Sequence, residues 1–567
     1  MQTCGPQTEL ADRIHASKYR LPGESFRDAM NRVAAALKDS DEHYHALRAI
    51  LLDQRFVPGG RIQSAMGSGR QVTAYNCFVS GTIADTMTGG DSSIMGRASE
   101  AAETMRRGGG IGYDFSTLRP SGAPIKKLGS TASGPVSFLK VFDAVGVSIS
   151  SSGHRRGAQM GVLRVDHPDI EEFIRCKQAD KSLTGFNLSV AVTDRFMRAV
   201  ENDDTHQLVF ERQVHREIRA RDLWEQIMRS TWDWAEPGIL FVDRINEMNN
   251  LVYCETISAT NPCGEQPLPP YGACLLGSFN LPRYLVLDDA GMPVAFDAAR
   301  LARDVPHVVR AMDNVIDRTS YPLHAQEEEA RSKRRMGLGV MGLATALEAL
   351  GHPYGSDRFL HVMRTILTRL RDRAYEASVE LAQEKGSFLA YHRDGHMASR
   401  FVATLPVSLQ DAIAAHGIRN SHLLSIAPTG TISRTCDFIS SGIEPVFALE
   451  TRRTMALGGQ DVEVIEQDYA HRLGWERGKL ASDCSADDHL RVLEVATEYV
   501  DSAVAKTCNV PASMPWAEFK ALYARAWMSG CKGCTTFQTG GKKTALLTAA
   551  EGASCTVDPQ TGERECA

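Results

Sequence analysis

The chain has 567 residues, of which 43% are hydrophobic and 23% charged, and its formal net charge is −6 at pH 7. This composition is typical of a globular protein with one large domain or several smaller ones, and the mild negative charge disfavours a protein that coats nucleic acid or binds membranes through basic surfaces. No apolar run reaches the ~18 residues that a membrane span needs, and the N-terminal sequence M-Q-T-C-G-P-Q-T-E-L lacks the features of a signal peptide, so we expect a cytoplasmic protein.

Residues 1–57 are predicted to form a short helical region. Phe26, Met30 and Leu37 belong to an apolar series with helical spacing. The sequence P-G-E at 22–24 interrupts any earlier helix, so we expect a new helix to begin after it.

Residues 58–540 are predicted to form one continuous α/β domain. Short apolar segments alternate with longer helical patterns; the former lie at 75–79, 188–192 and 422–426, the latter at 137–145, 223–232 and 359–370. Strands that alternate with helices predict parallel strands in an α/β layer or barrel. We find no proline- or serine-rich linker and no internal repeat that would divide this stretch.

The sequence T-N-P-C-G-E-Q at 260–266 places a thiol between an amide and a carboxylate. In an extended segment Asn261, Cys263 and Glu265 would point to one side, because side chains alternate along a strand. The carboxylate could then act as a general base while the amide orients a substrate. A neighbouring carboxylate disfavours a thiolate, so we expect chemistry of a neutral thiol, such as hydrogen-atom transfer, rather than a protease-type nucleophile. A turn with a buried structural cysteine is the alternative.

Residues 541–567 are predicted to form a flexible tail. They are polar, rich in small residues, and contain two cysteines, Cys555 and Cys566.

The thirteen cysteines are expected to be reduced, so each is a buried thiol, a metal ligand or a redox participant. Those outside any local motif are expected to be buried: Cys4, Cys176, Cys254, Cys436, Cys484 and Cys508. Cys531 and Cys534 form a C-x-x-C pair, for which a redox role is favoured over a zinc site shared with the tail pair. We expect no metal site.

The stretch N-P-C-G-E-Q-P-L-P-P-Y-G-A-C-L-L-G-S-F-N-L, which begins at Asn261, resembles the active-site finger loop of ribonucleotide reductases, most closely the adenosylcobalamin-dependent class II enzymes. Other segments resemble further motifs of the family: 56–79, 107–120, 155–170, 335–344, 427–433 and 530–535. The resemblance implies a ten-stranded α/β barrel with the finger loop at its centre, preceded by the helical region and followed by the tail.

The resemblance also implies a role for each of five residues. Cys263 would carry a transient thiyl radical that abstracts the 3′ hydrogen of a ribonucleotide. Glu265 would take the 3′-hydroxyl proton, and Asn261 would hydrogen-bond the substrate. Cys77 would protonate the departing 2′-hydroxyl, and Cys77 and Cys274 would supply two electrons and end as a disulfide.

Substrate and effector sites follow from the same resemblance. The turn A-P-T-G-T-I-S at 427–433 offers backbone N–H groups and hydroxyls to an anion, although such turns are usually only helix caps. The implied substrate-binding residues are Asn76, Gly109, Gly110, Pro428, Thr429, Gly430, Thr431 and Ser433. The implied effector-binding residues, for dNTPs or ATP at the face of a homodimer, are Asp85, Arg155 and Arg156.

The radical source is inferred by exclusion. The segment T-T-F-Q at 535–538 lacks the tyrosines through which class I enzymes pass a radical, and no glycyl-radical segment of class III is present. This leaves adenosylcobalamin, for which the sequence shows no binding motif. Cys555 and Cys566 would shuttle electrons from thioredoxin or glutaredoxin to the active site.

Two alternatives stand beside this reading. The same barrel could use another radical source, such as a class I-type partner subunit or a glycyl radical, or the chain could be a non-catalytic nucleotide-binding regulator. The joint presence of Asn261, Cys263, Glu265, Cys77 and Cys274 disfavours a regulator, which has no use for all of them.

Overall fold

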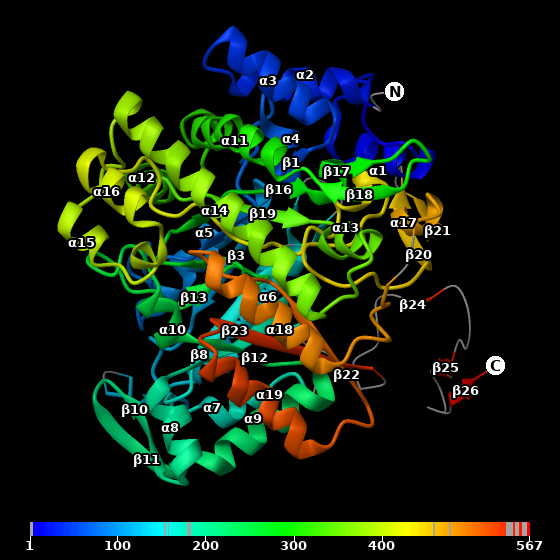
Figure 1. The fold of residues 1–567 in the computed structure, drawn as a ribbon. Coiled ribbons are helices and arrows are strands. Elements are labelled where there is room, and N and C mark those ends of the chain that lie inside the picture. The colour runs from blue at the N-terminus through cyan, green and yellow to red at the C-terminus, as the bar shows by residue number, and fades with distance from the viewer. Residues whose placement is uncertain are drawn as a thin grey trace.

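Three helices precede the first strand: α1 (Glu9–Tyr19), α2 (Phe26–Leu37) and α3 (Asp41–Leu52). The predicted helical region is therefore present, and its second helix begins where the sequence indicated. The capping residue is Ser25, whose hydroxyl accepts from the N–H of Asp28 while the Asp28 carboxylate accepts from the N–H of Ser25. This reciprocal pair fixes the helix start. Figure 1 shows these helices at one end of the molecule.

The computed structural model describes residues 4–126, 128–151, 155–156, 158–178, 183–457, 460–475 and 478–539, and the tail segments 548–549, 555–557 and 564–566. Within these residues the fold is mixed α/β, as predicted, and no helix is long and apolar enough to cross a membrane.

The largest sheet among the described residues has eight strands, in the order β15-β2-β3-β8-β9-β12-β23-β22. Their bounds are β2 (Cys77–Val79), β3 (Gly110–Asp114), β8 (Gln159–Arg164), β9 (Phe186–Val192), β12 (Gly238–Phe241), β15 (Ala273–Cys274), β22 (Thr507–Pro511) and β23 (Gly533–Thr539). The strands from β2 to β12 are all parallel, whereas β15 pairs antiparallel with β2, and β23 antiparallel with β12.

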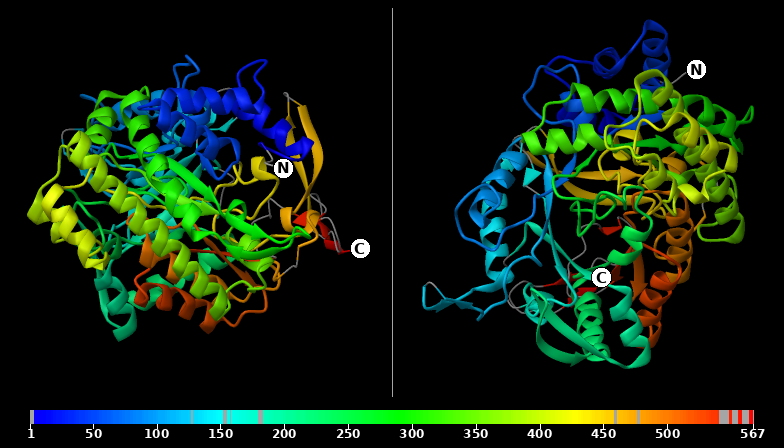
Figure 2. Two further views of the ribbon diagram at one scale, coloured as in Figure 1. Left: turned by 45° about the horizontal axis from the view of Figure 1, so that its top comes forward. Right: turned by 90° about the vertical axis from the view of Figure 1, so that its left-hand side faces the viewer.

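Helices connect the parallel strands, as parallel pairing requires. They are α5 (Ile94–Arg106), α6 (Gly134–Ser148), α7 (Ile170–Arg175), α8 (Asp194–Asn202) and α9 (Ala220–Trp234). The hairpin β10 (Thr205–Phe210) with β11 (Gln213–Arg219) lies beside α8 and α9 at the end opposite the N-terminal helices (Figures 1 and 2).

The two faces of the eight-stranded sheet bury different residues. On β9, Val190 and Val192 pack in the cluster formed with the outer helices, whereas Ala191 joins an inner cluster with Val79 and Leu240. This alternation follows from the two-residue period of a strand. The inner face is thus also apolar, and something must cover it.

A second, three-stranded sheet has the order β1-β16-β19. Its strands are β1 (Phe56–Pro58), β16 (Leu276–Asn280) and β19 (Gly337–Met341). Single β-bridges continue from it: Leu338 with Leu424, and Ile426 with Val504.

The strand predicted at 422–426 is therefore only a pair of bridging positions. The reason lies in Asp501, whose carboxylate accepts from the N–H groups of Leu423 at 2.7 Å and Leu424 at 2.9 Å. A side chain thus takes backbone donors that a neighbouring strand would otherwise bind.

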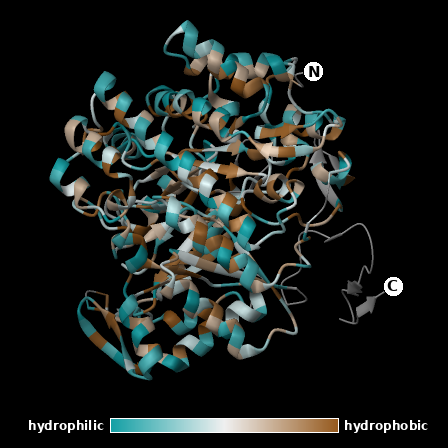
Figure 3. Ribbon diagram, in the orientation of Figure 1, coloured by the Kyte–Doolittle hydropathy of each residue, from teal (hydrophilic) through white to brown (hydrophobic). Residues whose placement is uncertain are grey.

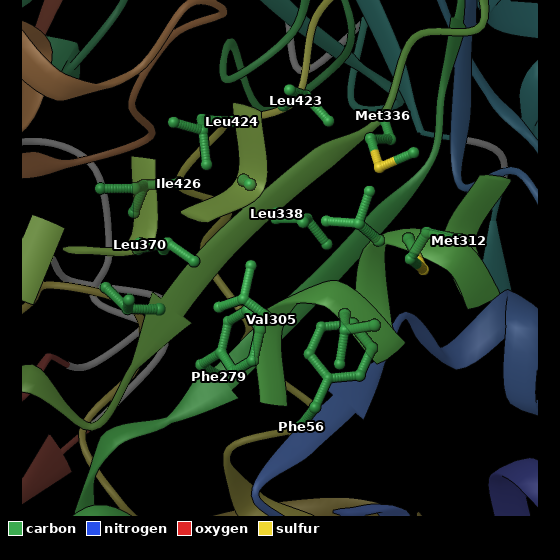
Figure 4. Close-up of a cluster of buried hydrophobic side chains, with 14 of the residues drawn as sticks. Phe56, Phe279, Val305, Met312, Met336, Leu338, Leu370, Leu423, Leu424 and Ile426 are labelled. Atoms are coloured by element: carbon green, nitrogen blue, oxygen red, sulfur yellow. The ribbon is translucent and has the colours of Figure 1, made fainter. Parts of the chain in front are cut away.

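The largest core cluster covers the outer side of the second sheet. There α11 (Ala298–Arg318) and α14 (Asp357–Lys385) lie over β16 and β19 (Figure 4). Phe279 of β16 is fully buried, and its ring centroid lies 5.1 Å from that of Phe56. Hydrophobic residues concentrate on the central strands, and hydrophilic ones on the outer helices (Figure 3).

The remaining longer helices complete the outer layer. They are α12 (His324–Lys333), α13 (Leu343–Ala349), α16 (Val407–His416), α18 (Ala486–Tyr499) and α19 (Trp516–Met528). Shorter ones are α4 (Gly60–Ala65), α10 (Val242–Glu247), α15 (Arg393–Met397) and α17 (Tyr469–Arg472).

The predicted flexible tail, 541–567, lies largely outside the described residues. Of its described segments, β24 (Thr548–Ala549) pairs with β20 (Glu450–Leu457), which also pairs with β21 (Gln460–Gln467). The strands β25 (Cys555–Val557) and β26 (Arg564–Cys566) pair antiparallel with each other.

Replacing Phe279 by Ala should destabilise the protein strongly. The side chain is fully buried in the main core cluster, so its loss leaves a cavity, and we expect the free energy of unfolding to fall by about 3–5 kcal/mol. The matched control is Leu287→Ala, whose side chain is 47% exposed and whose effect should stay within about 0.5 kcal/mol. Equal shifts of the denaturation midpoint in the two variants would contradict this assignment of the core.

Candidate active site

The motif at 260–266 forms the tip of a hairpin between β13 (Ala259–Thr260) and β14 (Pro267–Leu268). Gly264 donates its N–H to the carbonyl of Asn261 at 3.1 Å and has φ +83°, a conformation that favours glycine. Asn261 Oδ1 accepts from the N–H of Gln266 at 3.0 Å. The segment is thus a tight turn.

The expected extended geometry is wrong, and with it the alternation of side chains. Asn261 and Glu265 are almost fully buried, whereas Cys263 at the tip is exposed. The turn that Gly264 permits rotates Cys263 away from its two neighbours. The three residues still lie on one short loop.

The hairpin, residues 259–268, covers the inner face of the eight-stranded sheet. The Thr260 carbonyl lies directly against the α-carbon of Gly112, where a Cβ would overlap it. On β9, two strands away from β3 in the same sheet, Asn187 donates its amide to the Pro262 carbonyl at 2.8 Å. A Cβ on Gly110 would lie 3.1 Å from Pro262. Glycine on β3 therefore allows this close approach.

The other side of the hairpin is held by the second sheet and the bridging segments. The carbonyl of Glu265 accepts from the Ser425 hydroxyl at 2.9 Å and from the N–H of Ala503 at 3.0 Å. The Gln266 amide packs against Gly337 of β19, where a Cβ would overlap it. The hairpin thus lies between the two sheets, anchored on both sides.

The strand pairing brings Cys77 and Cys274 together. They are directly opposed residues of the antiparallel pair β2–β15. Opposed residues in such pairs have Cα atoms about 4.5–5.5 Å apart, which lies within the roughly 4.4–6.8 Å that a disulfide requires. The backbone at this point is therefore compatible with a reversible disulfide between the two residues.

Cys77 also faces the hairpin. Its Sγ would lie 3.3 Å from a Cβ on Gly110, the same glycine that Pro262 approaches. Burial, and next the negative charge of Glu265, raise the pKa of the Cys77 thiol to about 12. Cys77 is therefore a protonated thiol at neutral pH.

Glu265 is suited to accept a proton in this cluster, whereas Cys77 is suited to donate one. Burial raises the pKa of its carboxyl to about 7, opposed by the nearby Asn261 amide. It can gain or lose a proton near neutral pH, which suits a general base.

Several buried polar atoms around this cluster have no hydrogen-bond partner among the described residues. They include Asn261 Nδ2, Glu265 Oε2 and Asn76 Oδ1. Buried polar atoms are nearly always paired in folded proteins, so these atoms are available to the polar groups of a ligand. At the tip, Cys263 is exposed. Apart from Gly264 itself and its two chain neighbours, no atom of the described residues lies within 4 Å of the Cβ position of Gly264.

The predicted anion-binding turn at 427–433 is present as a loop. Thr429 has φ +54°, and its hydroxyl accepts from the N–H of Gly442 at 2.8 Å. Ser433 Oγ lies 3.1 Å from Ser441 Oγ. Pro428 and Gly430 are exposed, and Thr431 is half-buried.

A short 3-10 helix, η3 (Arg434–Cys436), follows this turn. It ends after three residues, because Asp437 directly after it adopts a left-handed backbone, with φ +63°. A helix this short supplies no useful dipole. Any anion here would be bound by loop N–H groups and hydroxyls.

The glycine-rich segment borders the same cluster. Gly109 packs on the Phe78 ring, where a Cβ would lie 2.7 Å from it, and Gly110 begins β3 opposite Cys77.

The predicted effector-binding residues lie on two separate segments of the chain. Asp85 forms an ion pair with Arg119 at 2.5 Å. Arg155 and Arg156 form β7, paired with β6 (Ser150–Ser151), while their neighbours His154 and Gly157 lie outside the described residues.

The other cysteines follow the expectation in part. Cys436, Cys484 and Cys508 are buried as predicted and Cys176 is half-buried, but Cys4 and Cys254 are exposed. Each of these two lies in a loop at the surface, before α1 and after α10.

Cys531 and Cys534 are buried in the same cluster as Cys508. Among the described residues no group of three or more potential ligands could hold a metal ion. Cys555 and Cys566 are opposed residues of the pair β25–β26.

Three residues of the site were not predicted from the sequence: Asn187 and Ser425, which anchor the hairpin, and Arg61. The Arg61 guanidinium packs against Gly108, and its positive charge partly opposes the rise in the pKa of Cys77. The P-G-G-R sequence at 58–61, directly after β1, was the available signal for Arg61.

Comparison with known proteins bears directly on this site. Residues 75–537 match the family model described as ribonucleotide reductase, barrel domain. A vitamin B12-dependent ribonucleoside-diphosphate reductase of Mycobacterium tuberculosis (strain CDC 1551 / Oshkosh) is 35% identical, over 96% of this chain and 80% of that protein. One of Thermoplasma acidophilum is 33% identical, over 93% and 69%. A vitamin B12-dependent ribonucleotide reductase of Streptomyces coelicolor is 28% identical, over 94% and 63%.

Replacing Gly112 by Ala should displace the hairpin, because the new methyl group would overlap the Thr260 carbonyl. We expect a loss of stability of about 1–3 kcal/mol and faster alkylation of Cys77 by iodoacetamide, read by mass spectrometry. Gly238→Ala on β12 is the control, since its Cβ would come no closer than 3.1 Å to a described atom, the Ser189 hydroxyl. Unchanged Cys77 labelling in Gly112→Ala would show that the hairpin does not rest on β3.

Proposed function

The chain belongs to the ribonucleotide reductases, the enzymes that convert ribonucleotides to 2′-deoxyribonucleotides, and we propose that its thiols carry out this reduction with adenosylcobalamin as the coenzyme. The observation that carries the proposal is the meeting of Cys77, Asn261 and Glu265 around unpaired buried polar atoms, with Cys274 opposite Cys77. The relatives named as ribonucleoside-diphosphate reductases favour diphosphate substrates.

The proposed reaction begins at Cys263. When bound, adenosylcobalamin supplies the radical that removes the hydrogen atom from this thiol. The exposed position of Cys263 beside Gly264 suits the approach of so large a group. The resulting thiyl radical takes the 3′ hydrogen of the ribose and returns a hydrogen atom there at the end of the cycle.

The buried residues handle the protons and the electrons. Glu265 accepts the 3′-hydroxyl proton, and the Asn261 amide hydrogen-bonds the substrate. Cys77, protonated because of its raised pKa, gives its proton to the 2′-hydroxyl, which leaves as water. Cys77 and Cys274 then supply two electrons and join in a disulfide, and the second thiol hydrogen goes to C2′. In total two S–H bonds and one C–O bond break, while one S–S, one C–H and one O–H bond form.

The predicted barrel belongs to the same proposal. β15 and β16 follow each other in the chain and belong to different sheets, and the bridges at Leu424, Ile426 and Val504 lead from β19 toward β22. These connections support a ring of ten strands, residues 58–540, around the hairpin. The helical region 1–57 and the tail 541–567 would lie outside that ring.

The remaining binding roles are proposed as follows. The substrate phosphates are bound by the loop residues Pro428, Thr429, Gly430, Thr431 and Ser433, and the nucleoside lies along Asn76, Gly109 and Gly110. Thr429 supports this role because its bond to Gly442 fixes the loop.

Regulation and reduction use the other proposed residues. dNTPs or ATP bind near Asp85, Arg155 and Arg156 in a homodimer. Thioredoxin or glutaredoxin reduces the Cys77–Cys274 disulfide through Cys555 and Cys566, whose opposed positions on β25 and β26 suit a dithiol pair. The names of the relatives favour the coenzyme over a partner subunit as radical source.

The proposal is tested by assaying ribonucleoside diphosphates with dithiothreitol, with and without adenosylcobalamin. We expect deoxyribonucleotides only with the coenzyme, and a loss of at least about 10³-fold in kcat for Cys263→Ala, since a nucleophilic or radical thiol has no substitute. Cys254→Ala, which removes another exposed thiol, should keep wild-type turnover. Turnover without the coenzyme would exclude its role, and turnover by Cys263→Ala would exclude the radical assignment.

Activity should fall as pH drops below about 7, because only the ionised Glu265 can accept a proton and its pKa is raised to about 7. We expect a decrease in kcat of about tenfold per pH unit on the acid side. Glu348 is a matched control: the pKa of this buried carboxyl is also raised to about 7, but it binds the N–H groups of Tyr354 and Lys479. In Glu348→Gln, kcat should still fall below about pH 7, whereas Glu265→Gln should lack activity at every pH. If Glu348→Gln no longer showed this fall in kcat at low pH, the assignment to Glu265 would be refuted.

A further inference from the structure

Lys532 is a fully buried cation in the turn between α19 and β23. Its residue is only 5% exposed, and its carbonyl accepts from the N–H of Phe241 on β12 at 3.0 Å. The backbone of Lys532 is thus fixed at the edge where β12 meets β23, and its side chain enters the interior from there.

The Lys532 ammonium binds backbone carbonyls only. Nζ donates to the carbonyls of Asp501 at 2.7 Å and Val500 at 3.4 Å, and to that of Ser502. Among the described residues it forms no ion pair. An ammonium has three donors in tetrahedral array, so one side chain satisfies three successive carbonyls of a tight turn.

Asp501, the nearest carboxylate, is used elsewhere. It accepts from the N–H groups of Leu423 and Leu424 and from the hydroxyl of Tyr375 at 2.8 Å. The carbonyls of the turn 500–502 therefore accept hydrogen bonds from Lys532, while the Asp501 carboxylate in the same turn accepts them from the backbone of 423–424. It is fixed from both directions.

The next residue, Ala503, connects this fixed turn to the active site. The N–H of Ala503 donates to the carbonyl of Glu265 at 3.0 Å, and the carbonyl of Ala503 accepts from the N–H of Ile426 at 3.1 Å. The Ser425 hydroxyl binds the same Glu265 carbonyl. The Ser502 carbonyl that Lys532 binds and the Ala503 N–H that binds Glu265 belong to the same peptide group.

We propose that Lys532 is a positioning residue of the catalytic site: its ammonium fixes the turn 500–502, and through Ala503 the turn fixes the backbone of Glu265. The proposal rests on the proposed function for the catalytic role of Glu265, but the positioning itself is a property of the fold. A methionine of similar volume would fill the same space without the cost of burying a charge, so the cation is expected to have a use.

The charge state at neutral pH agrees with this role. Burial lowers the pKa of Lys532 to about 8, opposed by the negative charge of Asp501. The other titratable group facing it across the small cavity between them is His422, whose pKa is lowered well below its ordinary value, by burial first. Near pH 7 Lys532 therefore keeps all three of its donors, and His422 is neutral.

The test compares Lys532→Met with Lys520→Met. The control makes the same change on α19, at a partly exposed lysine paired with Glu225. Hydrogen exchange followed by mass spectrometry reads the order of the hairpin directly. We expect Lys532→Met to accelerate amide exchange at 500–505 and 259–268, by about tenfold or more, while other strands and Lys520→Met keep wild-type rates. Unchanged exchange at 259–268 would overturn the proposal, whether or not the protein reduces ribonucleotides.

Kinetics provide the second measurement. If Glu265 is misplaced, kcat should fall about 10- to 100-fold with KM changed less than about threefold, because small displacements of a catalytic group cost rate rather than binding. A loss confined to KM would overturn the positioning role. Absence of turnover in the wild type would instead defeat the proposed function and leave the exchange result to decide the role of Lys532.

Ser425→Ala keeps the proposal testable if Lys532→Met does not fold. It removes the other donor to the Glu265 carbonyl and leaves the buried lysine in place. Ala503 is then the remaining donor to the Glu265 carbonyl, so the amide exchange rates at 259–268 should follow those at 500–505 more closely. Lys532→Gln should lower kcat by a larger factor in the Ser425→Ala background than in the wild type. Additive effects of the two substitutions would show that Lys532 does not act through Glu265.

Discussion

The fold depends on one constraint: a polar hairpin is buried between two sheets, and every backbone group that it brings inside needs a partner. Asn187 supplies one on the eight-stranded sheet, and Ser425 and Ala503 supply others on the opposite side. A buried peptide group without a partner costs as much as a lost hydrogen bond. The hairpin can therefore occupy the interior only where strands, bridges and side chains offer donors at fixed places.

The same burial sets the chemistry of the site. Removal from water raises the pKa values of both Cys77 and Glu265, so one remains a proton donor and the other titrates near neutrality. Desolvation is the first cause of each shift, and the negative charge of Glu265 raises the pKa of Cys77 further. A proton donor and a proton acceptor thus arise from the packing that holds the hairpin in place.

Much of the fold followed from the sequence, because periodicity and breakers report local structure. The helices within 26–37 and 357–385 and the strand 186–192 show clear patterns. The segment 422–426 did not behave as a strand, since Asp501, some 75 positions later in the chain, takes its backbone donors. No local pattern carries information on such a distant side chain.

The site was predictable to a different degree. Its residues were found through a family resemblance, but the turn geometry that separates Cys263 from Asn261 and Glu265 was not, because a two-residue alternation cannot report a positive φ at Gly264. Likewise, the motifs that contain Arg61 and Lys532 do not show what these side chains contact, and Ser425 lies in no motif. Sequence reasoning identifies the reactive residues more easily than it identifies the residues that hold them in place.

The strand 273–280 explains how the thiol chemistry can proceed with little motion. Its first part, β15, pairs with β2 and places Cys274 opposite Cys77, while its second part, β16, belongs to the other sheet. A disulfide between these residues would join strands that are already hydrogen-bonded neighbours. Oxidation and reduction therefore need not separate the two sheets, and the anchors of the hairpin can stay in place through the cycle.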